Sequence, residues 1–223
     1  MRLGIVVPVL NEAQGIAICL QTLQTFRADG HEVIVVDGGS TDTTLALAAP
    51  LCDQAITAPS GRANQMNAGA GLSKADVLLF LHADTLLPKS AVADICQALA
   101  QGAVWGRFDV SIQGRSLFLP LIATMMNLRS RWTGIATGDQ ALFVRRAVFE
   151  TLGGFASQPL MEDLELSARL RALGWPACIK SRVQTSGRRW DQKGAMRTVW
   201  LMWCLRWRYW RGESPEALAR AYQ

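Results

Sequence analysis

The chain has 223 residues, of which 50% are hydrophobic and 18% are charged, and its formal net charge is +5. This length and composition suit a folded domain with its own core, which excludes an intrinsically disordered protein. Residues 182–223 hold nine Lys and Arg against three acids, whereas residues 1–181 hold fourteen against fifteen. The basic C-terminal part favours an anionic lipid or an anionic substrate as a partner. No nucleic-acid partner is expected, because no recognisable binding motif accompanies the charge.

The cysteines and the N-terminus bear on the cellular compartment. The five cysteines are scattered without a CxxC pair, and the two histidines lie far apart, so neither a zinc site nor a disulfide framework is indicated. A reducing, cytoplasmic setting fits this pattern. The first residues lead into an apolar strand without a cleavage site, so we expect no signal peptide. The apolar runs at residues 117–126 and 199–205 are too short to span a bilayer.

In the first 100 residues, apolar runs bounded by turn residues alternate with helical patterns, which is typical of a parallel α/β sheet. Asn11 is expected to cap the helix after the first strand, and Ser40 or Thr41 the helix after the second. The predicted strands are residues 3–9, 33–37 and 77–81.

Beyond residue 100 the order of elements changes. Strands are predicted at residues 104–112 and 140–144, with an apolar helix at 117–128 between them. Three further helices are predicted: an amphipathic one at 162–173, a basic Trp-rich one at about 194–211, and a short one opening at Pro215. No repeat or linker is evident, so we expect one domain over residues 1–223.

Two of the predicted strands lead into an acid, Asp37 after the second and Asp84 after the third. Ligands of open α/β sheets bind at the carboxyl ends of the strands, so both side chains are expected in one crevice. Either acid alone is as readily a turn former or a helix cap. Together they favour Mg²⁺ or Mn²⁺, which takes one or two carboxylates and leaves its other positions to water and phosphates. A nucleoside diphosphate would be a suitable ligand.

Short motifs extend this pattern over most of the chain. They are residues 6–12 (VVPVLNE), 35–42 (VVDGGSTD), 61–70 (GRANQMNAGA), 82–84 (HAD), 162–163 (ED) and 186–190 (SGRRW). Their order and spacing resemble those of family 2 glycosyltransferases. The resemblance implies an A-type glycosyltransferase fold, in which a Rossmann-like, mostly parallel central sheet is flanked by helices and followed by a C-terminal helical tail.

The resemblance also implies which part of the chain binds the donor and which binds the acceptor, and it implies an activity. Residues 1–100 would form the nucleotide-sugar-binding half, residues 101–190 the acceptor half, and residues 191–223 the basic Trp-rich tail. The activity would be inverting transfer of a sugar from a nucleotide-diphosphate-sugar to an acceptor hydroxyl, assisted by Mg²⁺ or Mn²⁺. A UDP-sugar is the favoured donor and a GDP-sugar the next, and the acceptor is unidentified, with lipid-linked acceptors known in the family.

Site residues are carried over from the resemblance motif by motif. Asp163 would be the general base, with Glu162 beside it in the acidic pair, and Asp84 would hold the metal. Arg62 would face the base or the diphosphate. The residues expected to bind the nucleotide-sugar are Pro8, Glu12, Asp37, Gly38, Arg62, Asn67, His82, Ala83, Asp84, Arg188, Arg189 and Trp190.

Some of these positions have a simpler interpretation. Glu162 and Asp163 open a predicted helix, where the helix dipole alone favours acids. The family's metal motif usually begins with Asp, and this chain has His82 there, so a contact to the ribose must change. His82 is expected to hydrogen-bond the nucleotide or a neighbour, with metal ligation as the alternative. For Asp139, formation of a turn and contact with the acceptor are equally expected.

The tryptophans of the basic helix recur at spacings of three, four and three, which places them on one face: Trp200, Trp203, Trp207 and Trp210. This face can pack on the domain or on a second subunit as a homodimer, with the interleaved arginines in solvent. Alternatively it lies in a membrane interface, which would make the protein peripheral on the inner face of the membrane.

Two other functions remain open. A sugar nucleotidyltransferase also combines an α/β sheet with acids and a metal, but residues 8–12 (PVLNE) stand where its Gly-rich loop is expected. A nucleotide-sugar-binding or scaffold protein without transferase activity is the alternative that His82 favours. A Walker A kinase is excluded, because the chain contains no GxxxxGK[ST] run.

Overall fold

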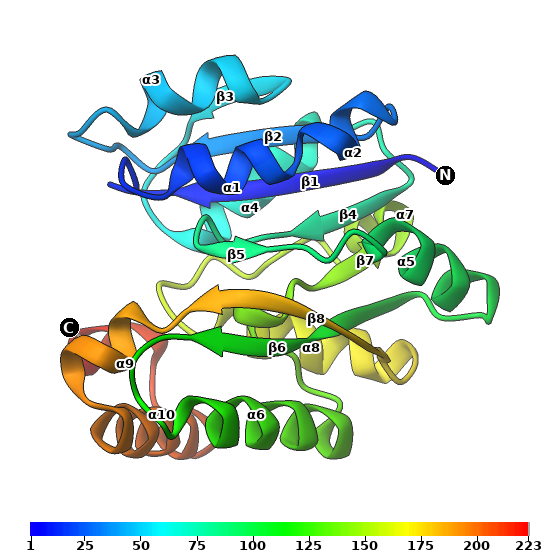
Figure 1. The fold of residues 1–223 in the computed structure, drawn as a ribbon. Helices are drawn as coiled ribbons and strands as arrows, with labels where there is room; N and C mark the ends of the chain where they lie inside the picture. Colours follow the sequence, from blue (N-terminus) through cyan, green and yellow to red (C-terminus); the bar gives the residue numbers. More distant parts are fainter. Residues whose placement is uncertain (223) are drawn as a thin grey trace.

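A computed structural model describes residues 1–222 (Figure 1). Its centre is an eight-stranded sheet in the order β3-β2-β1-β4-β7-β6-β8-β5. The strands are β1 (Leu3–Val9), β2 (Glu32–Asp37), β3 (Gln54–Thr57), β4 (Val77–Phe80), β5 (Thr85–Leu86), β6 (Trp105–Gln113), β7 (Phe143–Arg145) and β8 (Ala177–Ser186). The helices are α1 (Ile16–Thr22), α2 (Gln24–Ala28), α3 (Thr44–Ala48), α4 (Arg62–Leu72), α5 (Ala91–Ala100), α6 (Leu119–Thr133), α7 (Arg146–Thr151), α8 (Glu162–Leu173), α9 (Arg188–Lys193), α10 (Ala195–Trp210) and α11 (Pro215–Tyr222), with 3₁₀ turns η1 (Ala49–Leu51) and η2 (Gly138–Gln140).

The N-terminal half of the sheet is parallel, because β1 pairs in parallel with β2 and β4, and β2 pairs in parallel with β3. Every residue of β1, β2 and β4 is buried, which explains why these strands are apolar without alternation, apart from Glu32 and Asp37 at the ends of β2. Alternate side chains of β1 enter two separate cores: Ile5 and Val7 face α1 and α5, and Val6 faces α4. The three strands predicted in this half are confirmed.

The other half of the sheet is mixed. Strand β7 runs antiparallel to β4 and β6, β5 runs antiparallel to β8, and β6 pairs in parallel with β8. The strand predicted at residues 140–144 corresponds to β7, which begins later than predicted, at Phe143. The reason is local: the Thr137 backbone N–H donates to Gln140 Oε1 at 3.2 Å, and this capping box turns residues 138–140 into η2.

The helix caps predicted at Asn11, Ser40 and Thr41 are also corrected. Asn11 has a φ of 54° and lies before α1, which begins only at Ile16. Its Oδ1 accepts the Thr41 N–H at 2.9 Å, and its own N–H donates to Ser40 Oγ at 2.8 Å. These side chains therefore join the loops after β1 and β2 instead of starting helices, and α3 begins later, at Thr44.

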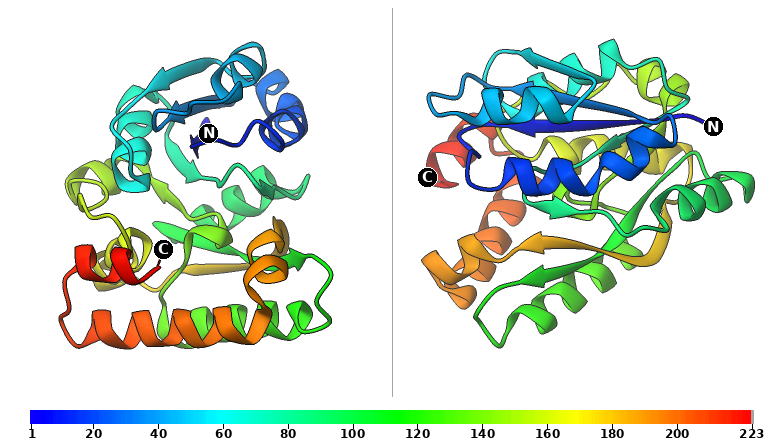
Figure 2. Two further views of the ribbon diagram at one scale, coloured as in Figure 1. Left: turned by 90° about the vertical axis from the view of Figure 1, so that its left-hand side faces the viewer. Right: turned by 45° about the horizontal axis from the view of Figure 1, so that its top comes forward.

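Helices cover both faces of the sheet (Figure 2). One core lies between the sheet and α1, α2, α5 and α6, and the other lies beneath α4, α7 and α8. In the second core, Phe80, Phe149 and Phe155 pack ring against ring with centroids 4.8–5.6 Å apart. The helix predicted at residues 162–173 is confirmed as α8.

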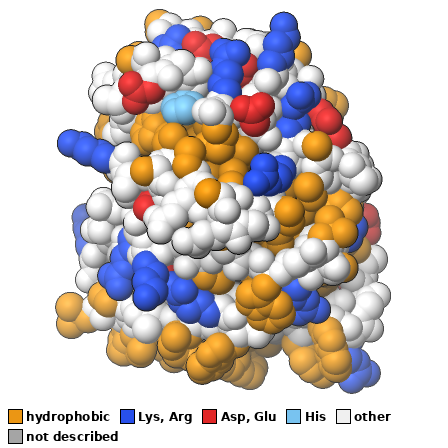
Figure 3. Space-filling view, turned by 90° about the vertical axis from the view of Figure 1, so that its right-hand side faces the viewer, with side chains coloured by type: hydrophobic (Ala, Val, Ile, Leu, Met, Phe, Trp, Pro, Cys, Tyr) orange, Lys and Arg blue, Asp and Glu red, His pale blue; other side chains and the backbone are white. Residues whose placement is uncertain are grey.

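The Trp-rich helix α10 does not bury its tryptophans. Those at positions 200, 203, 207 and 210 are 58–80% exposed, so packing of this face in the core of the domain is wrong. Helix α6 also carries exposed apolar side chains, including Leu121, Met125 and Trp132. Both helices lie along the lower edge of the molecule in Figure 1, and hydrophobic side chains line that edge in Figure 3. Within residues 1–222, no helix is long and apolar enough to cross a bilayer.

The packing of α4 on the sheet depends on the absence of a side chain at Gly69. A Cβ on Gly69 would lie 2.5 Å from Val6 Cγ1 and 2.9 Å from Val36 Cγ2, whereas a Cβ on Gly71 in the same helix would meet nothing within 4 Å. We predict that Gly69→Ala lowers the free energy of unfolding by about 1–3 kcal/mol, as overpacking does. The control Gly71→Ala should raise it by about 0.5–1 kcal/mol through helix propensity. Urea unfolding of both variants measures this, and equal effects would contradict the packing argument.

Candidate functional site

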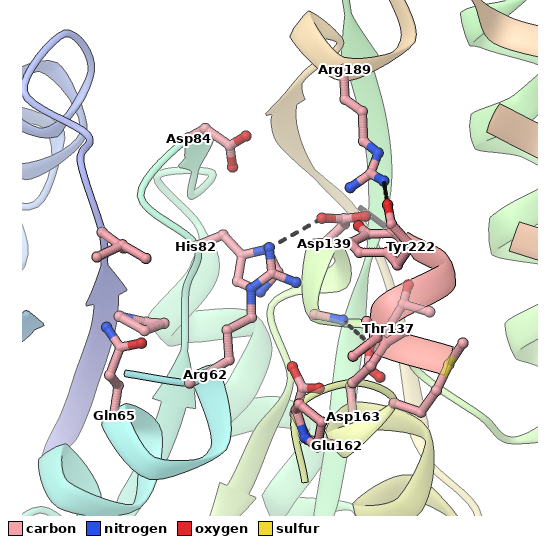
Figure 4. A pocket seen from close by; sticks show the side chains of 18 of the residues that line it. Arg62, Gln65, His82, Asp84, Thr137, Asp139, Glu162, Asp163, Arg189 and Tyr222 are labelled. Atoms are coloured by element: carbon pink, nitrogen blue, oxygen red, sulfur yellow. Dashed lines mark hydrogen bonds and ion pairs between the residues drawn. The ribbon is translucent and has the colours of Figure 1, made fainter. Parts of the chain in front are cut away.

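A cavity of about 850 Å³ opens at the carboxyl ends of β1 and β4 (Figure 4). Its wall combines residues from the N-terminal loops, from the loop after β4, from α8 and from the C-terminal helices. The expected site residues that line it are Pro8, Glu12, Arg62, His82, Ala83, Asp84, Glu162, Asp163, Arg188, Arg189 and Trp190. The fold therefore gathers into one cavity most of the residues that the motifs picked out.

Three expected nucleotide contacts are not brought into this cavity. The carboxylate of Asp37 accepts the backbone N–H groups of Gly39 at 3.0 Å and Ser40 at 2.9 Å. Both hydrogen bonds stabilise the turn that follows β2. The backbone N–H of Gly38 donates to Val9 O at 2.9 Å within the sheet edge.

Asn67 is the third of these residues. Its side chain donates to Phe155 O at 2.8 Å and accepts the Phe155 N–H at 2.9 Å. Both polar ends of the amide are thus satisfied by one backbone unit 88 residues away, which fastens α4 to the segment before α8. Because both polar ends of its side chain are used by the backbone of Phe155, Asn67 has a structural contact here instead of one in the cavity.

Asp84 offers a carboxylate at the cavity wall. Its Oδ1 has one long hydrogen bond, from Thr85 Oγ1 at 3.4 Å, and its side chain is half-buried. Residues 1–222 contain no group of three or more His, Cys, Asp and Glu side chains that could hold a metal ion by themselves. A single carboxylate suits Mg²⁺ or Mn²⁺ only where water and substrate phosphates complete the coordination. The donor set at Asp84 fits that arrangement.

His82 is committed to a neighbour. Its Nδ1 lies 3.2 Å from Asp139 Oδ1, and its ring lies against the backbone of Gly138, where a Cβ would be 2.4 Å from His82 Nε2. The side chains of His82 and Asp84 point apart in Figure 4. Burial raises the pKa of the Asp139 carboxyl, but the hydrogen bond and charge of His82, with Arg62 and Arg206, hold that pKa below its ordinary value. Asp139 is therefore an ionised partner of His82.

The acidic pair at the start of α8 faces Arg62. Burial and the adjacent carboxylate of Asp163 raise the pKa of Glu162 to about 7, against the opposing charge of Arg62. Arg62 is exposed to the cavity. The cavity walls reduce its contact with bulk water and so lower the pKa of its guanidinium, but the charges of Glu162, Tyr222, Asp139 and Asp163 raise that pKa above its ordinary value. Among the described residues, Arg62 has no hydrogen bond or ion pair within bonding distance, so its donors face the cavity.

Asp163 is held by two backbone groups. Its Oδ2 accepts the N–H of Gly138 at 2.8 Å, and its Oδ1 accepts the N–H of Leu164 at 2.8 Å. Each oxygen of a carboxylate has two acceptor positions, so one remains on each for a substrate hydroxyl. The two bonds fix the orientation of the carboxylate, as a general base requires.

The C-terminal wall combines the expected residues Arg188 and Arg189 with others that the sequence did not single out. Arg188 pairs with both oxygens of Glu12 at 3.1 Å, across 176 positions of the chain, and the Arg189 guanidinium stacks 3.7 Å from the ring centroid of Tyr222.

One face of α10 lines the cavity with Thr198, Met202 and Arg206. The expectation that the α10 arginines are all in solvent is therefore wrong for Arg206. The sequence does contain a signal for this face of α10, because Thr198, Met202 and Arg206 recur every four residues.

Comparisons with known proteins agree with this geometry. The family model described as "Glycosyl transferase family 2" matches residues 4–153. "Probable glycosyltransferase YdaM" of Bacillus subtilis is 28% identical in an alignment 243 residues long. That alignment covers 96% of this chain. The match covers 55% of that relative, so the chain spans about half of its length.

Two solved structures show the same fold. A mannosyltransferase from Pyrobaculum calidifontis, in complex with GDP-Man and Mn²⁺, matches 99% of this chain and 68% of its own at 21% identity, with a TM-score of 0.70. TarS from S. aureus, residues 1–349 with UDP-GlcNAc, matches 83% of this chain and 58% of its own at 17% identity, with a TM-score of 0.67. The expected A-type glycosyltransferase fold is confirmed.

The raised pKa of Glu162 makes stability depend on pH. Since the folded protein binds this proton more tightly than the unfolded chain, stability falls as pH rises from about 4.5 to about 7. We predict that Glu162→Gln removes this loss and, relative to wild type, gains on the order of 3 kcal/mol between pH 4.5 and pH 8. Urea unfolding at the two pH values measures the gain. Glu216→Gln, at an exposed position on α11, is the control and should show no such pH-dependent gain. A Glu162→Gln profile parallel to wild type would contradict the assignment.

Proposed function

Because the chain belongs to glycosyl transferase family 2, we propose that it is an inverting glycosyltransferase, which moves a sugar from a nucleotide-diphosphate-sugar to an acceptor hydroxyl. The observation that carries the proposal is one cavity lined both by Asp84 and by the acidic pair Glu162 and Asp163. The first supplies a metal ligand for a diphosphate, and the second supplies a base for a hydroxyl. Residues 1–100 would then hold the donor and residues 101–190 the acceptor.

The donor is proposed to be a UDP-sugar, with a GDP-sugar as the next choice. Support comes from the relatives in fold, one of which was solved with UDP-GlcNAc and another with GDP-Man and Mn²⁺. In this chain, Pro8, Ala83 and Asp84 line one part of the cavity, and Arg62 projects from the first turn of α4 with its donors unused. An anionic diphosphate would satisfy the Arg62 guanidinium better than the neighbouring carboxylates do.

The proposed reaction uses groups already fixed in the cavity. Asp163 takes the proton of the acceptor hydroxyl as that oxygen attacks the anomeric carbon. A bond forms from the acceptor oxygen to the anomeric carbon, the bond from that carbon to the diphosphate oxygen breaks, and the nucleoside diphosphate leaves with the electron pair. Attack from the face opposite the leaving group inverts the anomeric centre. A Mg²⁺ or Mn²⁺ ion held by Asp84 would neutralise charge on the leaving diphosphate.

Glu162 has a different role in this scheme. A carboxyl group with a pKa of about 7 is half-protonated near neutral pH, so it balances the charge of Arg62 only in part. Arg62 therefore keeps net positive charge toward the cavity, where the diphosphate is expected. The two neighbouring acids then divide into an oriented base and a group that adjusts the charge around Arg62.

The exposed Trp face of α10 supports a peripheral membrane location on the cytoplasmic side. Trp side chains are favoured at headgroup depth, and Arg197 near the start of this helix and Arg211 just after its end flank them, where anionic lipid would pair with them. A second copy of this chain is the other partner that would cover such a face. The basic charge of residues 182–223 favours the membrane, because two copies of a basic surface repel each other.

We predict that hydrolysis of a UDP-sugar depends on Mn²⁺ and on both assigned acids. Asp84→Ala should abolish the stimulation by Mn²⁺, because it removes the metal ligand. Asp163→Asn should lower the rate about 10²–10⁴-fold, since water in place of the acceptor needs the same base. Release of UDP from a panel of UDP-sugars, and of GDP from a panel of GDP-sugars, measures both effects.

The control for this panel is Asp29→Ala, an exposed acid at the end of α2 that does not line the cavity. Metal-stimulated hydrolysis retained by Asp84→Ala would disprove the metal assignment, and normal turnover by Asp163→Asn would place the base elsewhere. Binding of no nucleotide, with or without Mn²⁺, would favour a scaffold protein. Release of a nucleoside triphosphate when pyrophosphate is added would instead indicate a nucleotidyltransferase.

We predict that the protein sediments with vesicles that contain phosphatidylglycerol and not with neutral phosphatidylcholine vesicles. Trp207→Ala should weaken this binding about 5–30-fold, because a buried Trp contributes roughly 1–2 kcal/mol at an interface. Trp175→Ala is the matched control, since both tryptophans are 58% exposed but Trp175 lies after α8, away from α10. No binding to anionic vesicles would overturn the membrane proposal, and a dimer in light scattering would then explain the exposed face.

A further inference from the structure

Helix α6 is apolar on two opposite faces. Its inner face, which includes Ile122 and Ala123, packs into the core beneath the sheet. Its outer face carries a stripe of large apolar side chains at spacings of four, three and four residues: Leu121, Met125, Leu128 and Trp132. A helix that is apolar all round is normally covered on every side. In this structure three members of the stripe are 51–75% exposed, so the outer face of α6 lacks the cover that its composition calls for.

The turn before α6 extends this apolar surface. Leu117 is 94% exposed and Phe118 is 54% exposed. The turn that carries them is fixed, because the carboxylate of Asp191 accepts the backbone N–H groups of Arg115 at 2.9 Å and Ser116 at 3.2 Å. The protein thus holds two large apolar side chains out toward the surroundings on an ordered turn.

Exposed apolar side chains are concentrated on one side of the molecule. More than half of the large ones lie in residues 117–132 and 196–210, whereas α5, which packs on the same core as α6, exposes none. Helices α6 and α10 form the lower edge of the molecule in Figure 1 and stay there when it is turned by 90° about the vertical axis in Figure 2. An exposed apolar surface of this extent marks an interface.

The charges of this surface indicate which partner covers it. Residues 114–138 contain three arginines and no acid, and residues 195–212 contain four arginines and no acid. A groove of about 440 Å³ lies against the first half of α6, and its lining includes Arg115 and Arg182 but no acid. Among the residues that the structure describes, neither of these two guanidinium groups has a hydrogen bond or an ion pair. Apolar side chains bordered only by cations complement an anionic bilayer, and a second copy of the same surface would repel them.

We propose that α6 is a membrane-contacting helix that lies in the plane of an anionic bilayer, with its outer stripe among the lipid chains and with Arg115 and Arg182 on lipid head groups. The 15 residues of α6 rise only about 22 Å, which is too short to span the bilayer. This inference builds on the peripheral location proposed above for α10 and adds a second contact that can be tested alone. Two helices in contact with lipid would fix the orientation of the cavity relative to the membrane, which one helix cannot do.

The apolar stripe is tested by co-sedimentation of the chain with vesicles of phosphatidylglycerol and phosphatidylcholine, without nucleotide. Leu121→Gln and Met125→Gln should each lower the affinity for these vesicles about ten-fold, because each removes apolar surface from the lipid. The matched control is Ile18→Gln. Ile18 is 61% exposed and Leu121 is 60% exposed, but Ile18 lies on α1, in the upper half of the molecule in Figure 1. The vesicle affinity of this control should change less than two-fold.

The two arginines of the groove are tested with the same vesicles. Arg115→Gln and Arg182→Gln should each lower the affinity about five-fold, as expected for one basic residue near an anionic surface. Each should also reduce the loss of binding that added NaCl causes, since salt screens the lost attraction. Lys74→Gln is the control, because it removes the same charge from an exposed position between α4 and β4. It should change the affinity less than two-fold.

Three results would overturn the inference. The first is vesicle binding that Leu121→Gln and Met125→Gln leave unchanged, which would assign the contact to α10 alone if Trp207→Ala still weakened binding. The second is a wild-type dimer in light scattering that Leu121→Gln dissociates, because the face would then be a subunit interface. The third is a urea unfolding midpoint well below wild type in both variants, since the stripe would then stabilise the fold. We expect midpoints equal to wild type, because these side chains are exposed.

The proposed function is tested separately, by hydrolysis of UDP-sugars in the absence of vesicles. Leu121→Gln should hydrolyse them at the wild-type rate, because Leu121 does not line the cavity. If wild type binds vesicles through α6 but hydrolyses no nucleotide-sugar, the proposed function fails and the membrane contact of α6 remains. If hydrolysis is normal and the α6 variants bind vesicles as wild type does, the membrane contact of α6 fails and the proposed function remains.

Discussion

The hydrogen bond from the backbone N–H of Gly138 to Asp163 Oδ2, at 2.8 Å, organises this cavity. It connects the loop before β7 to the first turn of α8, and these segments carry the residues that face the acceptor. Gly138 has no side chain to keep the ring of His82 away, and the next residue, Asp139, holds that ring through Nδ1. One short turn, η2, therefore fixes the position of His82 and the orientation of the proposed base, which explains why the exchange of Asp for His in the metal motif does not disorder the site.

The charges around this turn are balanced unevenly, and the imbalance gives the cavity its chemistry. Asp139 is surrounded by His82 and cationic side chains that keep it ionised, while Glu162, next to Asp163, is driven toward its neutral form. Environments that push neighbouring carboxyl groups in opposite directions are typical of sites that move protons. The lining carries five acids against four arginines, so the partial neutralisation of Glu162 brings the two signs close to balance. An anionic diphosphate would therefore need a cation beside Asp84.

The parts of the molecule that were predictable share a physical origin. Strands β1, β2 and β4 are covered on both faces, so their sequences are continuously apolar and unmistakable. Helix α4 was not predicted, because its polar residues and glycines form no apolar stripe, and its packing depends on the small size of Gly69. Strand β8 was missed because most of its residues are partly or fully exposed. The direction of Arg206 depends on how α10 lies against the domain, which periodicity alone does not specify.

The two sides of α10 belong to one argument about the acceptor. One side exposes four tryptophans, and another side lines the cavity with Thr198, Met202 and Arg206. A water-soluble acceptor would leave the tryptophans unexplained. An amphiphilic acceptor would account for both sides, because its apolar part can remain in the lipid that the tryptophans would contact while its hydroxyl reaches the cavity. The same helix would then bind the membrane and form the wall of the cavity, since a helix is a rigid connection between the two.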